Sequence, residues 1–170
     1  LPLKTFGKEA VTRMNELGIV VDVSHLNEGG FWDVAALSKK PFIATHSCAR
    51  ALRNHNRNLT DKQLKAIANA GGVVGINYLS LFLHEVNTPE QDHTTIEDVA
   101  HHLCHIRNVA GIDTLALGSD YDGIGCTLEW KDCAGTPQLL EGLNKYFTAD
   151  ELDKLTHKNA LRVFKDVWRG

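Results

Sequence analysis

The chain has 170 residues and a formal net charge of −3, from 18 Lys or Arg and 21 Asp or Glu residues. Its length suits one ordinary domain, and its 43% of hydrophobic residues can form a packed core. The weak negative charge argues against a nucleic-acid-binding protein, and no apolar run reaches the ~20 residues of a membrane span. The first residue is Leu1 rather than Met and begins no signal peptide, so we expect the chain to be part of a longer gene product.

Short apolar runs alternate with amphipathic stretches along the chain. Thr60 and Gln63 have the spacing of a capping box, which predicts the start of a helix. Apolar residues between Ile96 and Val109 recur at helical spacing and predict a long amphipathic helix. In chain order, the sequence predicts a helix at 6–17, a strand at 19–24, a helix at 28–38, a strand at 42–46, a helix at 61–70, a strand at 73–78, a loop at 79–94, a helix at 95–110, a strand at 114–118, and helices at 149–155 and 157–168.

The predicted strands are apolar throughout and are separated by helices. This alternation predicts an α/β fold in which helices cover a parallel sheet on both faces. No internal repeat, low-complexity tract or linker divides the sequence. We therefore expect residues 1–170 to form one unit.

Polar side chains follow every predicted strand at its carboxyl end. The four ends read DVSH at 22–25, THS at 45–47, NY at 77–78 and GSDYDG at 118–123. The opposite ends of the strands carry no comparable residues. Because functional groups of parallel α/β proteins gather at the carboxyl ends of the strands, these segments form the candidate functional site.

His25 and His46 follow consecutive predicted strands and lie 21 residues apart in the sequence. Neighbouring parallel strands are about 4.8 Å apart, so the two imidazoles can bind one ion. Neutral imidazole suits zinc, and Asp120, at a third strand end, adds a carboxylate near the same centre. Each residue alone also fits a hydrogen-bonded side chain or a turn cap, but the coincidence of all three favours a metal centre.

Arg57 lies in the loop after the second predicted strand. Above a metal centre it can bind a substrate carboxylate through two parallel hydrogen bonds, although a solvated surface arginine would have the same spacing. Three further histidines, His101, His102 and His105, share one predicted helix without an HExxH motif. They therefore favour a polar helix face over a metal site.

The chain has four cysteines and no CxxC pair, which excludes a zinc ribbon. Cys126 and Cys133 lie in one Gly-containing loop and could form a disulfide. Four free thiols in a reducing compartment are the favoured interpretation, which favours a cytoplasmic location.

Six segments together match one known pattern: FGKEAVTRMNELGIVVDVSH, KPFIATHS, NRNLTD, GGVVGINY, GIDTLALGSDYDG and KNALRVF. These segments occur in the order and at the spacings of the membrane (renal) dipeptidase family, which the sequence therefore resembles. Members of this family are zinc dipeptidases with an amidohydrolase-type barrel. The resemblance spans nearly the whole chain. It implies a (β/α)8 TIM barrel of the metal-dependent hydrolase type, of which this chain forms about the last four β/α units.

The resemblance also implies roles for individual residues. His25 and His46 resemble two ligands of one zinc ion, and Arg57 resembles the arginine that binds the substrate carboxylate. Asp120 resembles the catalytic aspartate that transfers a proton to the leaving amine. The residues that resemble the border of the substrate pocket are Tyr78 and Phe82. The implied reaction is the hydrolysis of dipeptides by a metal-bound hydroxide at a centre of two zinc ions.

One part of the family pattern is missing. The family also uses an N-terminal His-x-Asp pair, a bridging Glu and a further His, and no HxD occurs in these 170 residues. We therefore expect residues 1–170 to be the C-terminal half of a single barrel domain, with part of a binuclear site. Because a half-barrel has two open sheet edges, we expect it to pair with the missing N-terminal half or to form a homo-oligomer.

Two other functions fit the same residues. One is a metal-dependent hydrolase of the same superfamily that acts on another amide or on a lactone. The other is an inactive fragment or binding module. Arg57 favours a substrate with a free carboxylate, and therefore a dipeptide.

Overall fold

The computed structural model describes residues 1–168. Within this range, no helix is long and apolar enough to cross a membrane. The strands of the main sheet are β1 (Val74–Asn77) and β3 (Leu115–Ser119), and a second small pair is formed by β2 (His93–Thr94) and β4 (Thr127–Leu128). The helices are α1 (Thr5–Leu17), α2 (Glu28–Leu37), α3 (Asp61–Asn69), α4 (Ser80–Leu83), α5 (Ile96–Ala110), α6 (Thr136–Leu143), α7 (Ala149–Asp153) and α8 (Asn159–Trp168).

The main sheet consists of four extended segments that run parallel, side by side in chain order. β1 pairs with β3 over their whole length. On the other side of β1, Ala44 bridges to Val74, and Asp22 bridges to Ile43 in the next segment. The predicted strands at 73–78 and 114–118 are therefore confirmed. The segments at 19–24 and 42–46 lie where strands were predicted, but only single bridges join them.

The side chain of Asp22 interrupts the regular ladder between these two segments. The backbone N–H groups of Ser24 and Thr45 both donate to Asp22 Oδ1, each at 3.0 Å. In a regular parallel pair, the Thr45 N–H would instead donate to a main-chain oxygen of the first segment, as the Ile43 N–H does to Val21. The prediction of two continuous strands was therefore wrong, because a carboxylate replaces part of the ladder.

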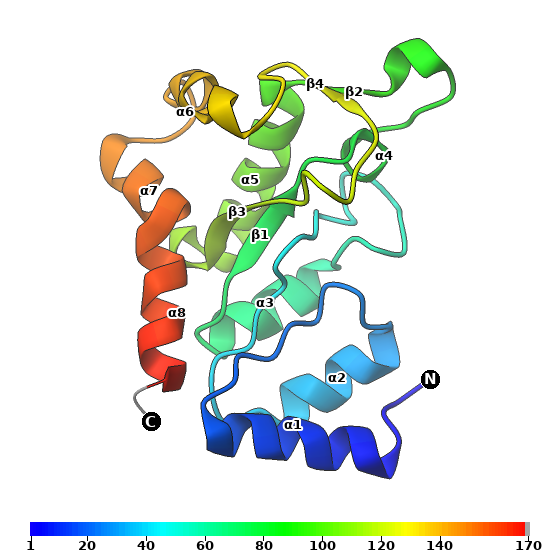
Figure 1. Ribbon diagram of the computed structural model, residues 1–170, viewed down its shortest axis with the longest axis vertical. Coiled ribbons are helices and arrows are strands. Elements are labelled where there is room, and N and C mark those ends of the chain that lie inside the picture. Colours follow the sequence, from blue (N-terminus) through cyan, green and yellow to red (C-terminus); the bar gives the residue numbers. More distant parts are fainter. Residues whose placement is uncertain (169–170) are drawn as a thin grey trace.

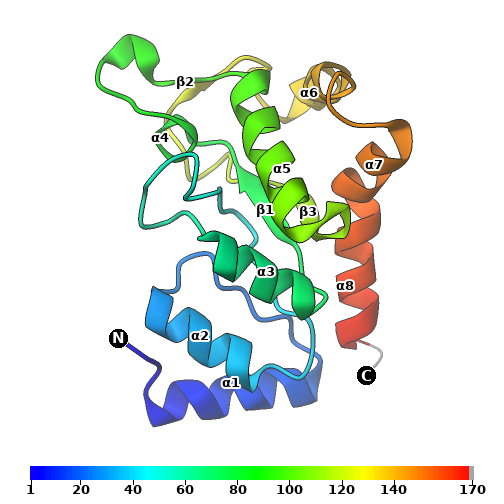
Figure 2. The same ribbon diagram turned by 180° about the vertical axis from the view of Figure 1, so that it is seen from behind.

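Helices α3 and α5 cover one face of the sheet, as Figure 2 shows from their side. The capping box predicted at Thr60 and Gln63 begins α3. The opposite face, which is turned to the viewer in Figure 1, is only partly covered. There, Val163 and Val167 of α8 pack against Val73 and Ala116. Since Asp22 and other residues of this face stay exposed, the prediction of helices over both faces holds only in part.

Two glycines let the second extended segment lie against both strands. A Cβ atom at Gly75 in β1 or at Gly118 in β3 would overlap the main-chain oxygen of Thr45. Any side chain at either position would therefore push this segment away. The peptide that precedes His46 is thus held against two strands at once.

Several elements were not predicted. The predicted loop at 79–94 contains the single-turn helix α4 and strand β2, and α6 lies in a region for which nothing was predicted. A π-helical turn, Lys154–Lys158, joins α7 to α8, so the two predicted C-terminal helices are nearly continuous. All four cysteines are free, so Cys126 and Cys133 form no disulfide in this structure.

Candidate functional site

The carboxyl ends of the first two extended segments bring His25 and His46 together. Their Nε2 atoms lie 2.8 Å apart, and their ring centroids lie 4.9 Å apart with the ring planes inclined at 56°. His25 is exposed and His46 is partly buried. The two nitrogens thus face one point at the open surface, as two ligands of a single ion must do.

Asp22 and Thr45 determine which nitrogen of His46 carries the proton. Thr45 Oγ1 donates to Asp22 Oδ2 at 2.6 Å, and the same oxygen lies 2.8 Å from His46 Nδ1. Because the Thr45 hydroxyl proton is directed at the carboxylate, Oγ1 can only accept from Nδ1. Nε2 of His46 is then unprotonated, with its lone pair directed at Nε2 of His25. A hydrogen-bond acceptor on the second ring nitrogen, which fixes the tautomer, is typical of metal-binding histidines.

The ionisation of both groups agrees with this arrangement. Burial alone would raise the pKa of Asp22, but hydrogen bonds from Thr45 and Ser24 outweigh it and lower this pKa below its usual value. Burial lowers the pKa of His46, although the nearby carboxylates of Asp120 and Asp22 oppose the effect. His46 is therefore neutral, as a metal ligand must be, and Asp22 is charged, as its supporting carboxylate must be.

The donor set of two imidazoles fits part of a zinc site. Zinc binds histidine nitrogen readily and usually takes three or four protein ligands. Within residues 1–168, no group of three or more His, Cys, Asp or Glu side chains is arranged to hold a metal ion. His25 and His46 therefore suit zinc, and a complete site would need ligands from outside the described residues.

Arg57 lies next to this pair and has a free buried donor. Its Nε donates to the main-chain oxygen of Ser24 at 3.1 Å, and its guanidinium lies 5.4 Å from the ring centre of Phe82. The terminal nitrogen Nη2 is buried and has no hydrogen-bond partner. A buried charged donor without an acceptor is costly, so this nitrogen is suited to receive a bound anion.

Asp120 is held in a strained turn at the end of β3. Its Oδ2 accepts a hydrogen bond from Asn77 Nδ2 at 3.0 Å. Ser119 and Asp120 have φ angles of 43° and 72°, in the left-handed region that non-glycine residues rarely adopt. A Cβ atom at Gly123 would overlap the Asp120 carboxylate, so Gly123 leaves space for it. Strain of this kind is common at functional sites.

The two predicted pocket residues have different surroundings. Phe82 lies against Arg57 and against the ring of His55, with 4.7 Å between the ring centres. Tyr78 is only 2% exposed and packs edge-on against Tyr121 and Trp130. Phe82 is thus part of the surroundings of Arg57, whereas Tyr78 belongs to a buried aromatic cluster.

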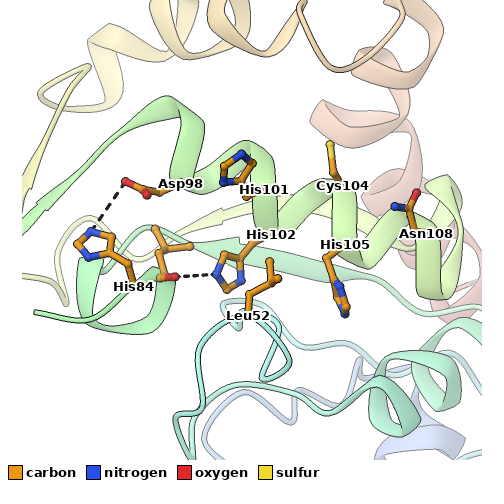
Figure 3. Close-up of a pocket in the computed structure, with 9 residues that line it drawn as sticks. Leu52, His84, Asp98, His101, His102, Cys104, His105 and Asn108 are labelled. Atoms are coloured by element: carbon orange, nitrogen blue, oxygen red, sulfur yellow. Dashed lines mark hydrogen bonds and ion pairs between the residues drawn. The ribbon is translucent and has the colours of Figure 1, made fainter.

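A surface hollow of about 490 Å³ lies along α5, and its lining includes four of the remaining histidines (Figure 3). His101 is exposed, and its Nε2 lies 3.6 Å from Glu97 Oε1. Nε2 of His105 lies 2.8 Å from Asp61 Oδ1. These two agree with the predicted polar helix face. His102 does not, because it is 1% exposed. Its place in the sequence carries a signal of this burial, because His102 follows Val99 by three residues and precedes Ile106 by four, and so lies on the apolar face of α5.

The sequence matches one known protein family over nearly its whole length. The family model described as membrane dipeptidase (peptidase family M19) matches residues 2–169. An uncharacterised protein from the region 5′ of pqqA in Klebsiella pneumoniae is 42% identical over 98% of this chain and 62% of its own length. An uncharacterised dipeptidase of Schizosaccharomyces pombe is 35% identical over 96% of this chain and 39% of its own length.

A solved structure shares the fold closely. The metallopeptidase of Rhodobacter sphaeroides, crystallised with a phosphinate mimic of the dipeptide L-Ala-D-Ala, superposes with a TM-score of 0.91 at 36% identity. The match covers 98% of this chain but 48% of that protein. The chain thus spans about half the length of the proteins that it resembles. Because the family model matches nearly all of its residues, the chain belongs to the membrane dipeptidase family, peptidase family M19.

Proposed function

We propose that the chain is the C-terminal half of a (β/α)8 barrel that hydrolyses dipeptides. The observation that carries this proposal is the pair of facing Nε2 atoms of His25 and His46, with the free Nη2 of Arg57 nearby. A metallodipeptidase needs side chains that bind its metal, and an arginine beside them can bind the carboxylate of the dipeptide. Membership of the family and the dipeptide mimic bound to the R. sphaeroides relative support the same substrate class.

Zinc is the metal that we propose. His25 and His46 would hold one of two ions, and the other ligands would come from the missing N-terminal half. When bound, zinc lowers the pKa of water and polarises the peptide carbonyl. The contribution of this chain is to keep His46 Nε2 unprotonated through Thr45 and Asp22.

Arg57 fixes the substrate in this proposal. Its free Nη2 would donate to the carboxylate at the end of the dipeptide, while Phe82 and the Ser24 carbonyl hold the guanidinium in place. Because this contact requires a free carboxylate one residue beyond the scissile bond, peptides that extend further at the carboxyl end are excluded. Phe82 would border the pocket, whereas Tyr78 would contribute only through its buried packing against Tyr121 and Trp130.

Asp120 would transfer the proton to the leaving amine. Asn77 orients its carboxylate through Oδ2, and the turn keeps it near His46. A carboxylate held by a single neutral donor can take up and release a proton without losing its position. Asp122, which is exposed, would have no part in the chemistry.

The rest of the barrel is the partner that we propose. Within residues 1–168, no strand pairs with the outer edge of β3 or with the outer edge of the 19–24 segment. Free edges of this kind need a covering strand. The missing half of the barrel would pair with both of them and supply the remaining metal ligands.

The metal ligands can be tested by zinc content. We expect His25→Ala or His46→Ala to remove one zinc ion per barrel and to abolish dipeptide hydrolysis, because each substitution leaves one imidazole where two are needed. Atomic absorption of the purified barrel measures this. His101→Ala, at an exposed histidine, is the matched control and should retain all of the zinc. Full zinc content in both ligand variants would contradict the assignment.

The role of Arg57 predicts a specific kinetic change. We expect Arg57→Ala to raise KM for dipeptides about 10- to 100-fold, which corresponds to the loss of hydrogen bonds to a charged group. The zinc content should not change. Steady-state kinetics on the barrel measure KM, with Arg13→Ala at an exposed position as the control. An unaltered KM would exclude the carboxylate role.

The role of Asp120 predicts a change in kcat instead. We expect Asp120→Asn to lower kcat about 10²- to 10⁴-fold, because the amide cannot transfer a proton. Asn can still accept the hydrogen bond from Asn77, so the turn and the zinc content should be preserved. The neighbouring exposed carboxylate provides the control, Asp122→Asn. A kcat close to that of the unaltered protein would show that another group handles the proton.

A further inference from the structure

The short helix α4 satisfies only its first carbonyl group, that of Ser80, which accepts from the backbone N–H of His84. An α-helix cannot satisfy the last four of its C=O groups by itself, and α4 has only four residues. Its last three residues, Leu81, Phe82 and Leu83, lie between the loop that carries Arg57 and helix α5. The carbonyl groups of this turn therefore need donors from elsewhere.

Three side chains supply these donors, one for each successive carbonyl. Arg53 Nε donates to the Leu81 oxygen at 3.3 Å, and Asn58 Nδ2 donates to the Phe82 oxygen at 2.7 Å. Arg53 and Asn58 both belong to the loop of Arg57 itself. The third carbonyl, that of Leu83, is 2.9 Å from Nε2 of His102 on α5 (Figure 3).

The other ring nitrogen of His102 fixes its tautomer. The backbone N–H of Ala49 donates to His102 Nδ1 at 3.0 Å. Nδ1 must therefore be unprotonated, and Nε2 must carry the proton that it donates to Leu83. His102 thus joins the segment after His46, through Ala49, to the end of α4.

Burial keeps this histidine neutral. It lowers the pKa of His102 to about 4, although the hydrogen bond to the Leu83 carbonyl and the carboxylate of Asp98 oppose the effect. Both hydrogen bonds are therefore present at neutral pH. The ring is a fixed link between α5 and the two segments.

The end of α4 determines the position of Phe82, and Phe82 supports Arg57. The guanidinium lies over the Phe82 ring, 5.4 Å from its centre, and the ring of His55 packs against the same side chain. A shift of the Leu83 carbonyl would move Phe82 and hence the place where Arg57 is held.

We propose that His102 is a positioning residue for substrate binding, which acts through Leu83 and Phe82 to hold Arg57 in place for the carboxylate of the dipeptide. This inference rests on the proposed function of Arg57. It assigns His102 no contact with the substrate or the metal. Its expected effect is therefore on KM, with little effect on kcat or zinc content.

Two substitutions separate this role from a loss of stability. His102→Gln places an amide donor near the position of Nε2 and can retain the bond to Leu83, whereas His102→Asn places an acceptor near Nδ1 and can retain only the bond to Ala49. Each variant leaves one buried partner without a hydrogen bond, so we expect similar losses of thermal stability. We expect His102→Asn to raise KM about five- to tenfold, the effect of one lost hydrogen bond, and His102→Gln to stay within about twofold.

The same pair of substitutions at His101 is the matched control, since that neighbour on α5 is exposed and should change neither KM nor stability. Equal rises in KM for His102→Asn and His102→Gln, or no rise in either, would overturn the proposal. A further measurement needs no variant: nitrogen chemical shifts of the His102 ring should show a protonated Nε2 at neutral pH, and a protonated Nδ1 would overturn it as well.

The result also distinguishes this inference from the proposed function. If Arg57→Ala leaves KM unchanged, the carboxylate role itself is wrong. If Arg57→Ala raises KM and His102→Asn does not, the function stands and only the role of His102 is wrong.

Discussion

The site depends first on the contact between the Asp22 carboxylate and Thr45. This carboxylate accepts hydrogen bonds from the Thr45 hydroxyl and from the backbone N–H groups of Thr45 and Ser24. It thereby joins two extended segments where a regular ladder would otherwise continue. The same contact directs the Thr45 oxygen at His46 Nδ1 and leaves the lone pair of Nε2 facing His25. One charged group thus determines both the local backbone and the protonation of a proposed metal ligand.

The remaining parts of the site are arranged around this contact by close backbone packing. Gly75 and Gly118 let the Thr45 peptide lie against β1 and β3. The backbone N–H of Ser24 donates to the Asp22 carboxylate, and the main-chain oxygen of Ser24 accepts a hydrogen bond from Arg57 Nε. The groups proposed to bind metal and substrate are therefore joined by one set of hydrogen bonds, and such positioning of the two binding sites favours catalysis.

Much of this arrangement could be predicted from the sequence where the signal was local. The periodic apolar stripe of α5 and the capping box at Thr60 predicted helices that the structure contains. The polar ends of the strands predicted which residues meet, since parallel strands place their carboxyl ends at one edge. His25 and His46 are 21 residues apart in sequence and adjacent in space for this reason.

The parts that could not be predicted depend on contacts between distant residues. Asp22 reads as one polar residue in an apolar run, and nothing nearby shows that it replaces a backbone ladder. α4 has a single turn and is held by Arg53, Asn58 and His102 rather than by its own residues. The hydrogen-bond partners of His102, Ala49 and Leu83, likewise lie far from it in the sequence, although its helical spacing from Val99 and Ile106 is that of a buried position.

The most direct test of this account is the zinc affinity of an Asp22→Asn variant, measured by competition with a chromophoric chelator. An amide at this position would donate to Thr45, whose hydroxyl would then donate to His46 Nδ1 and shift the ring proton to Nε2. We predict that the affinity falls about 10- to 100-fold, the range typical of lost support for a metal-binding histidine. The affinity should stay unchanged in Asp122→Asn. An Asp22→Asn variant that binds zinc as tightly as the unaltered protein would contradict the central role of Asp22.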